Sequence, residues 1–450
     1  MNPGDSSVSH AEQSSVLYGL HAQMSHRRAA IVGLQHMLAM FVGIITPPLV
    51  ISRALNFPTS QTAYLVSMAL VASGLATFVQ VRRFGNMGSG LLSVQGTSFA
   101  FVTPLIQAGQ FGGLPLMLGM SFFLSPVEMV LSRFLVKLQR IFTPLVSGVV
   151  VLMIGFSLIP VSVKSIAAGL GEGAPEWAGL VVAGIVIAVV LVLHALKRPW
   201  ARISAVAVAL LVGYGICAAA GYLEYSPPTS GAWLMLPIPF KYGLAFRWDL
   251  VLPFLLLYVI TAIETIGDLT ATSQLSGEPI QGPVYWKRIS GGVLADGFNS
   301  ALAAACNSFP NTTFSQNNGV IQLTGVAARQ AGFWVAGFLC LFGVFPFISG
   351  WLAIMPAPVL GGITLLLFGF VAAAGVGILK RVELTHTNML ILAMSIAAGV
   401  GVQTVPEVLG PLPETARLVL GSSITTGGLT ALLLNALLSG GLSMRTGLHG

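Results

Sequence analysis

Two acidic residues, Glu264 and Asp268, lie in the middle of an apolar stretch from Val251 to Pro279 that is long enough to cross a bilayer. A charged carboxylate at the centre of a membrane costs at least ~2.5–3.5 kcal/mol, so acids at this depth belong by default to a binding site or an ion pathway. On a helix, Thr261, Glu264, Asp268 and Thr272 fall within about 80° of one another and form one polar face. One alternative stays open, in which a neighbouring helix satisfies both carboxylates and they only hold the bundle together.

The densest polar sequence runs from Asn307 to Gly325 and contains Gln316, Asn317, Asn318 and Gly319 in succession. Taken alone, these four residues are typical of an exposed turn. Their setting between apolar spans instead favours a short helix that starts there and directs its free N–H groups into the protein. Such a helix start suits an electron-rich or anionic ligand. The Gln316 amide can also donate and accept a hydrogen bond at once.

Two other apolar segments carry polar groups that need partners inside the protein, because hydrocarbon offers none. Gln35 and His36 interrupt the first segment, and a buried histidine there is either a hydrogen-bonded structural residue or a proton carrier. The third segment contains the run 95–99, whose glycine, threonine and serine predict extended or broken backbone. Within this run Ser98 adds a hydroxyl, and Phe99 offers a flat apolar surface for a ring.

Two further acids lie in apolar segments. Asp296 has Asn299 on the same helical face and Gly297 beside it, a combination that predicts close helix packing together with a polar contact. Glu128 lies near the end of the fourth segment and precedes Arg133. For Glu128 we expect an ion pair or a helix cap at the inner face of the membrane.

The composition sets the class of protein. Of the 450 residues, 55% are hydrophobic and 8% are charged, and the mean hydropathy of +0.87 indicates a polytopic membrane protein. The first 30 residues are polar and lack a signal-peptide core, so we expect a cytoplasmic tail. Three cysteines in apolar runs are expected to be buried thiols, and neither a metal nor a cofactor is expected. The placement of the basic residues points to membrane topology, and no nucleic acid is expected as a partner.

Apolar segments recur about fourteen times and predict an all-α polytopic membrane protein. They lie at residues 31–51, 63–81, 91–106, 114–131, 141–161, 179–196, 205–223, 250–274, 289–306, 316–328, 331–348, 359–379, 389–402 and 418–438. With both termini cytoplasmic, five of the 21 lysines and arginines fall at the outer ends: Arg53, Lys164, Lys241, Arg247 and Arg417. This bias is the one expected when basic residues stay inside. The third and tenth segments are short for a full crossing.

The two halves of the chain echo each other. The sequence that begins at Thr143 and opens the fifth segment resembles the one that begins at Ala357 and opens the twelfth, at a shift of 214 residues. Seven crossings separate them, so the two halves would have opposite orientations in the membrane. This pattern predicts a 7+7 inverted repeat, an architecture that places substrate near the membrane midplane between discontinuous helices. Chance similarity between glycine-bearing and proline-bearing apolar helices is the alternative.

The run from Gln316 to Gly325 resembles the signature Gln/Glu-Asn-x-Gly-x4-Thr-x of the nucleobase-ascorbate transporters, a family of nucleobase:cation symporters. Glu264 and Asp268, the pair Gln35 and His36, the run 95–99 and Asp296 also stand where that family has corresponding features. The resemblance covers nearly the whole chain beyond the N-terminal tail. Within the family, the chain most resembles the bacterial xanthine permeases.

The resemblance implies an architecture of two domains. A core domain would comprise residues 31–140 and 249–350, and a gate domain residues 141–248 and 351–440, flanked by tails at 1–30 and 441–450. It further implies short strands and half-helices in the third and tenth segments. A homodimer in the bacterial inner membrane and an elevator-like movement of the core are also implied.

The resemblance also assigns roles to residues. Those matching Glu264 and Gln316 bind the base in the family, and the one matching Phe99 packs nearby. We therefore expect the substrate to be bound by Glu264, Gln316, Phe99, Asn317, Gly319 and Ser98. Proton coupling or another essential polar role is expected of Asp268, Asp296 and His36. Uracil-type members tend to have Glu in place of Gln316 and His in place of Asp268. The residues of this chain at both positions differ from these and favour a dioxopurine as the substrate.

These observations predict a proton-coupled symporter that imports xanthine. Burial and a like-charged neighbour both favour the protonated form of a carboxyl group, so we expect Glu264 and Asp268 to share the coupling task. A urate or uracil symporter of the same family and an anion carrier of the same fold remain as alternatives. A channel, which would conduct passively, is a further alternative. A membrane-embedded enzyme is disfavoured, because the sequence holds no HExxH, no Gly-x-Ser-x-Gly and no paired Cys/His ligands.

Overall fold

The structure, a computed structural model, describes residues 17–135, 143–171, 173–196, 198–223, 234–380, 382–413, 416–417 and 420–443. Residues 1–16 and 444–450 of the expected tails lie outside the described residues. The described chain is helical apart from two short strands. Its elements are α1 (His26–Ala54), α2 (Thr59–Arg82), β1 (Gln95–Thr97), η1 (Phe99–Phe101), α3 (Val102–Leu131), α5 (Pro144–Ala167), α6 (Glu176–Ala195), α7 (Pro199–Ala219), η2 (Trp248–Leu250), α8 (Val251–Leu275), α9 (Gly282–Ala305), β2 (Asn311–Thr313), α10 (Gln316–Thr324), α11 (Arg329–Val344), α12 (Pro346–Ala353), α13 (Ala357–Leu379), α14 (His386–Thr404), η3 (Pro406–Leu409) and α16 (Ser423–Ser443).

Eight of the described helices are long and apolar enough to cross a membrane, or nine if α11 and α12, bent by 72°, are counted as one span. The protein is therefore an all-helical membrane protein. The described helices support fewer full crossings than the fourteen predicted segments. One reason is that the tenth predicted segment forms a helix of only nine residues, α10.

The third and fourth predicted segments form a strand followed by one bent helix. The chain is extended at β1, turns through η1 and continues as α3. Within α3 the backbone leaves the helical conformation at Gly112 and Gly113, and the φ of 62° at Gly113 is one that favours glycine. The predicted boundary between the two segments therefore corresponds to a kink.

The α10 half-helix ends at Gly325, whose left-handed backbone (φ 65°) is typical of a helix C-terminus. The end of the expected N-terminal tail pairs with the chain just beyond α10. Tyr18 donates its N–H to the Gly325 carbonyl (3.1 Å) and accepts the N–H of Ala327 (2.8 Å). The α1 helix then begins at His26, capped by the Ser25 hydroxyl, five residues before the predicted segment.

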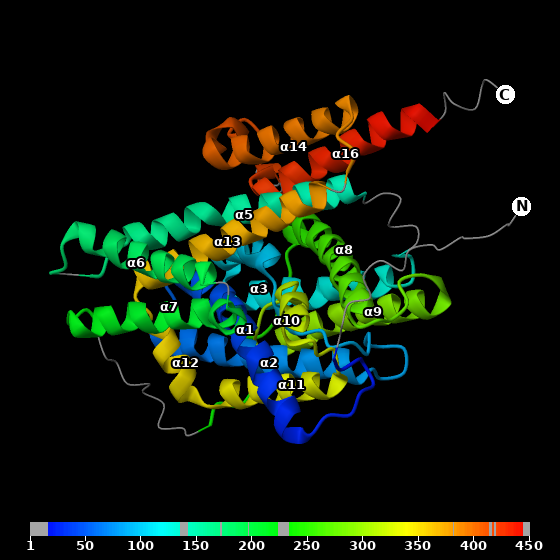
Figure 1. Ribbon diagram of the computed structural model, residues 1–450. Helices are drawn as coiled ribbons and strands as arrows, with labels where there is room; N and C mark the ends of the chain where they lie inside the picture. The colour runs from blue at the N-terminus through cyan, green and yellow to red at the C-terminus, as the bar shows by residue number, and fades with distance from the viewer. Residues whose placement is uncertain are drawn as a thin grey trace, which may run out of the picture.

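The helices pack mainly in two groups. The first group contains α1, α2, α3, α8, α9 and α11, with α10 against α1 and α8. The second group contains α5, α6, α7, α13, α14 and α16. In Figure 1, α14 and α16 lie side by side along one flank of α5, while α2 and α11 lie together on the opposite side of the bundle.

The helices that carry the echoed sequences, α5 and α13, pack against each other along most of their length. A Cβ at Gly148 would lie 2.7 Å from Leu379, and a Cβ at Gly155 would lie 2.5 Å from the backbone nitrogen of Ala372. Since the contact on α13 moves back along the sequence as the contact on α5 moves forward, the two helices are antiparallel. Antiparallel packing is what opposite orientation of the two halves requires.

The replacement Gly155→Ala tests this contact. A methyl group has no room beside Ala372, so we expect the variant to lose ~1–3 kcal/mol through overpacking, although alanine is otherwise the better helix former. Gly184→Ala in α6 is the matched control, because a Cβ there meets nothing within 4 Å. Thermal unfolding in detergent should show a lower melting temperature for Gly155→Ala alone. Equal melting temperatures of the two variants would contradict the close packing.

Candidate functional site

Two short strands inside the first helix group allow two helices to begin within the protein. β1 and β2 pair antiparallel, with Gln95 opposite Thr313 and Thr97 opposite Asn311. Beyond the ladder, Ser98 donates its N–H to the carbonyl of Pro310 at 2.8 Å. This pairing satisfies the extended backbone, which is otherwise not tolerated at membrane depth. The short strands expected in the third and tenth segments are therefore present.

Each strand is followed by a helix start. η1 and α3 follow β1, and α10 follows β2. The first N–H groups of a helix have no partner within the helix and carry a partial positive charge. The half-buried Phe99 ring stacks on Phe314, with ring centroids 6.3 Å apart, and meets the edge of Phe368 of α13 at 5.6 Å. Phe99 therefore marks the place where the start of the α3 segment reaches the second helix group.

The polar face of α8 is fixed to the start of α10. The Asp268 carboxylate accepts the hydroxyls of Thr313 (2.8 Å) and Ser315 (2.6 Å). One turn further along, the Thr272 hydroxyl donates to the side chain of Asn318 at 2.7 Å. Asp268 is therefore already engaged within the protein, and these bonds hold the half-helix against α8.

Glu264, Gln316 and Gly319 form the open part of the site. Glu264 is half-buried, Gln316 is exposed, and neither side chain makes a hydrogen bond or ion pair within the described residues. Gly319 follows Gln316 by three residues and so lies on the same side of α10. A Cβ at Gly319 would meet nothing within 4 Å. The Gln316 amide thus borders open space at the start of α10, and the unengaged Glu264 carboxylate lies one helical turn from Asp268, which bonds to the neighbouring Ser315.

His36 and Asn317 form a buried contact on the other side of α10. His36 Nδ1 lies 2.9 Å from Asn317 Oδ1, and the Asn317 amide donates to the Leu92 carbonyl at 2.6 Å. Both side chains are fully buried or nearly so. The structure therefore directs Asn317 towards α1 and not towards the open space beside Gln316.

Asp296 is fully buried on α9 and is linked to Asp268 through hydroxyl groups. Its Oδ2 accepts the hydroxyl of Thr265 at 2.6 Å and that of Thr312 at 3.3 Å. The Thr265 hydroxyl lies 3.4 Å from that of Thr313, which donates to Asp268. Sequence reasoning missed these threonines, although Thr312 and Thr313 stand just before Gln316 in the sequence. The Ser98 hydroxyl is buried and has no hydrogen-bond partner within the described residues.

The expected ion pair or cap of Glu128 at the inner face is wrong. Glu128 is fully buried, and it takes part in no ion pair among the described residues. The α3 helix continues to Leu131, so Glu128 still lies within it and faces α9. Its carboxyl group lies next to that of Asp296. Sequence spacing to Arg133 could not show this contact with another helix.

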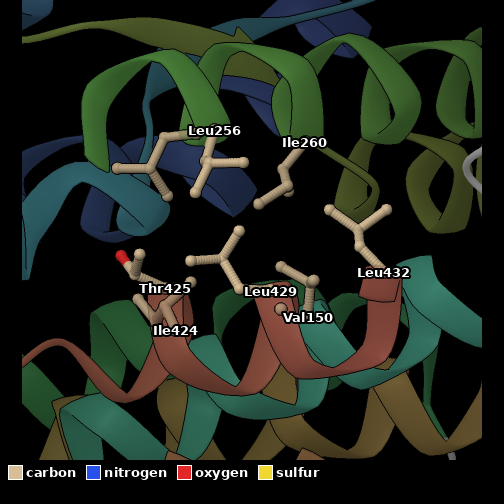
Figure 2. Close-up of a pocket in the computed structure, with 9 residues that line it drawn as sticks. Val150, Leu256, Ile260, Ile424, Thr425, Leu429 and Leu432 are labelled. Atoms are coloured by element: carbon tan, nitrogen blue, oxygen red, sulfur yellow. The ribbon is translucent and has the colours of Figure 1, made fainter. Parts of the chain in front are cut away.

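An apolar crevice lies beside the site, between α8 and the second helix group. Leu256 and Ile260 of α8 face Ile424, Leu429 and neighbouring residues of α16 across it (Figure 2). Ile260 precedes Glu264 by one turn, so the crevice adjoins the polar face of α8. In the part of the chain that the structure describes, no three His, Cys, Asp or Glu side chains are grouped to hold a metal ion.

Comparison with known proteins gives long matches at high identity. The chain is 45% identical to the xanthine permease XanP of Escherichia coli K12, over 95% of this chain and 96% of that protein. It is 39% identical to the xanthine permease XanQ of the same organism, over 99% and 98% of the two chains. It is 34% identical to the uric acid permease PucJ of Bacillus subtilis, over 91% and 92%.

Solved structures show the same fold at low sequence identity. The transmembrane domain of the cyanobacterial bicarbonate transporter BicA matches with a TM-score of 0.59 and 14% identity, over 92% of this chain and 99% of that one. SLC26A9 matches with a TM-score of 0.60 and 11% identity, over 90% of this chain and 65% of that one.

A profile described as a permease family, that of the xanthine and uracil permeases, matches residues 27–408. The protein is thus a multi-pass membrane transporter and not an enzyme, and the chain belongs to the xanthine/uracil permease family.

Proposed function

We propose that the protein is a proton-coupled symporter that imports xanthine across the bacterial inner membrane. The observation that carries the proposal is the pair Glu264 and Gln316, whose side chains have no partner within the described residues, with Gln316 exposed beside the open space at Gly319. Similarity to two xanthine permeases along nearly the whole chain supports xanthine as the substrate.

The chemistry of the free groups fits a dioxopurine. Xanthine presents ring N–H donors beside carbonyl acceptors, so the Glu264 carboxylate can accept from N–H groups while the Gln316 amide pairs with a complementary edge. Phe99 offers a ring face, and Gly319 and Ser98 complete the proposed site. Each unmade hydrogen bond in a buried site costs roughly 1–3 kcal/mol, so an analogue that lacks one group should bind about ten- to a hundredfold more weakly.

Urate is the second candidate substrate, because PucJ, a uric acid permease, is 34% identical to this chain. Urate and xanthine present similar edges to the two free side chains. An anion carrier fits less well, although BicA and SLC26A9 share the fold. An inorganic anion placed beside Glu264 and Asp268 would meet two carboxyl groups of its own sign when they are ionised.

The proposed coupling uses the acids of α8 together with Asp296. Glu264 stands one turn from Asp268, so ionisation of one opposes ionisation of the other. His36 and Asn317 would hold α10 in place through their buried contact, and Asn317 would thereby position Gln316 without touching the substrate. One proton per substrate suffices energetically, because ~2.3 kcal/mol per charge at 100 mV supports roughly fifty-fold accumulation.

We further propose a core domain of residues 31–140 and 249–350 that moves like an elevator against a gate domain of residues 141–248 and 351–440. The separate packing of the two helix groups supports this division. The apolar crevice between α8 and α16 supports a sliding movement, because aliphatic contacts carry no directional bonds. The antiparallel α5 and α13 support a 7+7 inverted repeat of fourteen segments. The homodimer and the cytoplasmic placement of both termini rest on the family resemblance and the basic-residue bias.

Uptake of labelled xanthine into cells that lack their own purine permeases tests the function. We expect accumulation that a protonophore abolishes and that excess unlabelled xanthine blocks, because the proton gradient drives entry through one site. Excess uracil should not compete, since it lacks the second ring.

The same uptake experiment distinguishes the alternative functions. Transport of urate without transport of xanthine would move the substrate within the family. Equilibration of xanthine that is insensitive to the protonophore would indicate a channel or uniporter. No transport of any nucleobase by protein confirmed in the membrane would overturn the proposal in favour of an anion carrier.

The replacement Gly319→Val tests the location of the site. A Cβ at Gly319 meets nothing within 4 Å, so the valine side chain would project into the open space beside Gln316, and we expect normal folding and a rise of at least about tenfold in the xanthine KM. Gly337→Val in α11 is the matched control, since Gly337 is also helical and exposed and a Cβ there meets nothing within 4 Å. Unchanged KM in a well-folded Gly319→Val protein would place the substrate elsewhere.

A further inference from the structure

Glu128 is a buried acid without a partner. It lies on α3 with 0% of its surface exposed, and neither carboxylate oxygen makes a hydrogen bond of good geometry with a described residue. Its polar neighbours are Thr261 of α8 and Asp296 of α9. The hydroxyl of Thr261 lies within hydrogen-bond distance of two carbonyl oxygens of its own helix, those of Leu257 and Tyr258, which compete with Glu128 for its one proton. A carboxylate left in this state loses its hydration and gains nothing in return.

Close packing of α9 on α3 brings a second carboxyl group to Glu128. A Cβ at Gly297 would lie 2.9 Å from the backbone nitrogen of Met129 and 3.0 Å from the carbonyl oxygen of Ser125. Only a glycine allows this approach, and it sets the neighbouring Asp296 against Glu128. Asp296 Oδ2 has its two hydroxyl donors, but Oδ1 has none within the described residues. Each of the two acids therefore has at least one carboxylate oxygen without a hydrogen-bond partner among the described residues.

Among the described residues, no cation offsets the charge of the two acids. The titratable groups that surround them come from α8, which presents Tyr258, Glu264 and Asp268, and all of these are neutral or acidic. The Tyr258 hydroxyl donates to the Ser121 carbonyl at 2.6 Å and is therefore not available to the pair. Within the described residues no group of acids converges on one point as it would around a metal ion. A proton is the remaining species that joins two carboxyl groups, through an O–H···O⁻ hydrogen bond.

We propose that Glu128 and Asp296 hold one proton between them and that this pair carries the proton which is coupled to substrate binding. The inference rests on the proposed function and adds Glu128 as a coupling residue. One proton halves the charge of the pair and gives the unpaired oxygens a shared hydrogen bond. Its loss leaves two bare charges facing each other in a dry interior, which is the costly state that coupling can exploit.

A chain of hydroxyl groups connects the pair to the open site. Asp296 accepts from Thr265, whose hydroxyl lies 3.4 Å from that of Thr313, and Thr313 in turn donates to Asp268. Asp268 also accepts the hydroxyl of Ser315, which is exposed beside Gln316. Both hydroxyls donate outward, to Asp296 and to Asp268, so transfer begins when the Thr313 hydroxyl rotates towards Thr265. A protonated Asp268 then gives its proton to the Thr313 oxygen, Thr313 gives its own to Thr265, and Thr265 gives its own to Asp296. No hydroxyl therefore changes its charge after the transfer.

The test measures the xanthine Kd of the purified full-length protein as a function of pH. In the wild type a single linked proton changes the apparent Kd by up to about tenfold per pH unit, with weaker binding as the pH rises and the pair loses its proton. Glu128→Gln places an amide where the protonated acid stood, so it mimics the proton-loaded pair permanently. We expect this variant to bind xanthine tightly with a flat pH profile and to lose accumulation driven by a pH gradient. Glu128→Asp keeps a carboxyl group and should restore the dependence of the xanthine Kd on pH.

Controls separate this role from a structural one. Glu407→Gln removes an exposed carboxylate and should keep the wild-type profile. A role in packing alone would lower the melting temperature of Glu128→Gln and leave the slope of Kd against pH intact, and that result would overturn the proposal.

If Glu128→Gln does not fold, the variant Thr265→Val tests the proton path instead. It should slow proton movement after a pH jump while Thr265→Ser does not, and equal rates would contradict the hydroxyl chain.

Failure of the proposed function gives a different result. A wild-type protein that binds no xanthine at any pH contradicts the substrate and with it the inference. A wild-type protein that binds xanthine with the expected slope, together with a Glu128→Gln variant of equal slope, contradicts the inference alone.

Discussion

The structure depends on the pairing of two three-residue strands inside a bundle of membrane helices. Backbone N–H and C=O groups in a bilayer must be satisfied within the protein, and a broken helix exposes them. β1 and β2 satisfy one another through the register from Gln95 opposite Thr313 to Thr97 opposite Asn311. This ladder allows the α3 segment and α10 to begin at membrane depth. It therefore creates what a continuous helix cannot offer, a helix start inside the protein.

The acids around these helix starts differ in how they are satisfied, and this difference suits them to different tasks. Asp268 is bonded to two hydroxyls and fixes α8 to the start of α10. Glu264, one turn away, has no partner within the described residues and is free for a ligand. Asp296 and Glu128 are fully buried, and no cation from the described part of the chain offsets their charge. In the account proposed here, binding takes place at the free acid and the proton is held at the buried pair, with hydroxyl groups between them.

Much of this arrangement could be predicted from the sequence, because local patterns determine it. The spacing of Glu264 and Asp268 predicts one polar face, and the small and polar residues at 95–98 and 307–319 predict broken segments. Contacts between distant segments could not be predicted. Glu128 appears in the sequence as a neighbour of Arg133, whereas close packing at Gly297 sets it against Asp296. The direction of the Asn317 side chain depends on His36, 281 positions away, and the short motif around Asn317 holds no information about it.

Xanthine and a proton are proposed to cross the membrane together through the site at Glu264. The most direct measurement uses purified protein in liposomes that contain a pH-sensitive dye, with no pH gradient at the start and labelled xanthine added outside. Xanthine entry is expected to acidify the interior in the wild type, and Glu264→Gln is expected to abolish this proton movement. Entry of xanthine without acidification, or equal acidification in the wild type and in Glu264→Gln, would contradict this coupling.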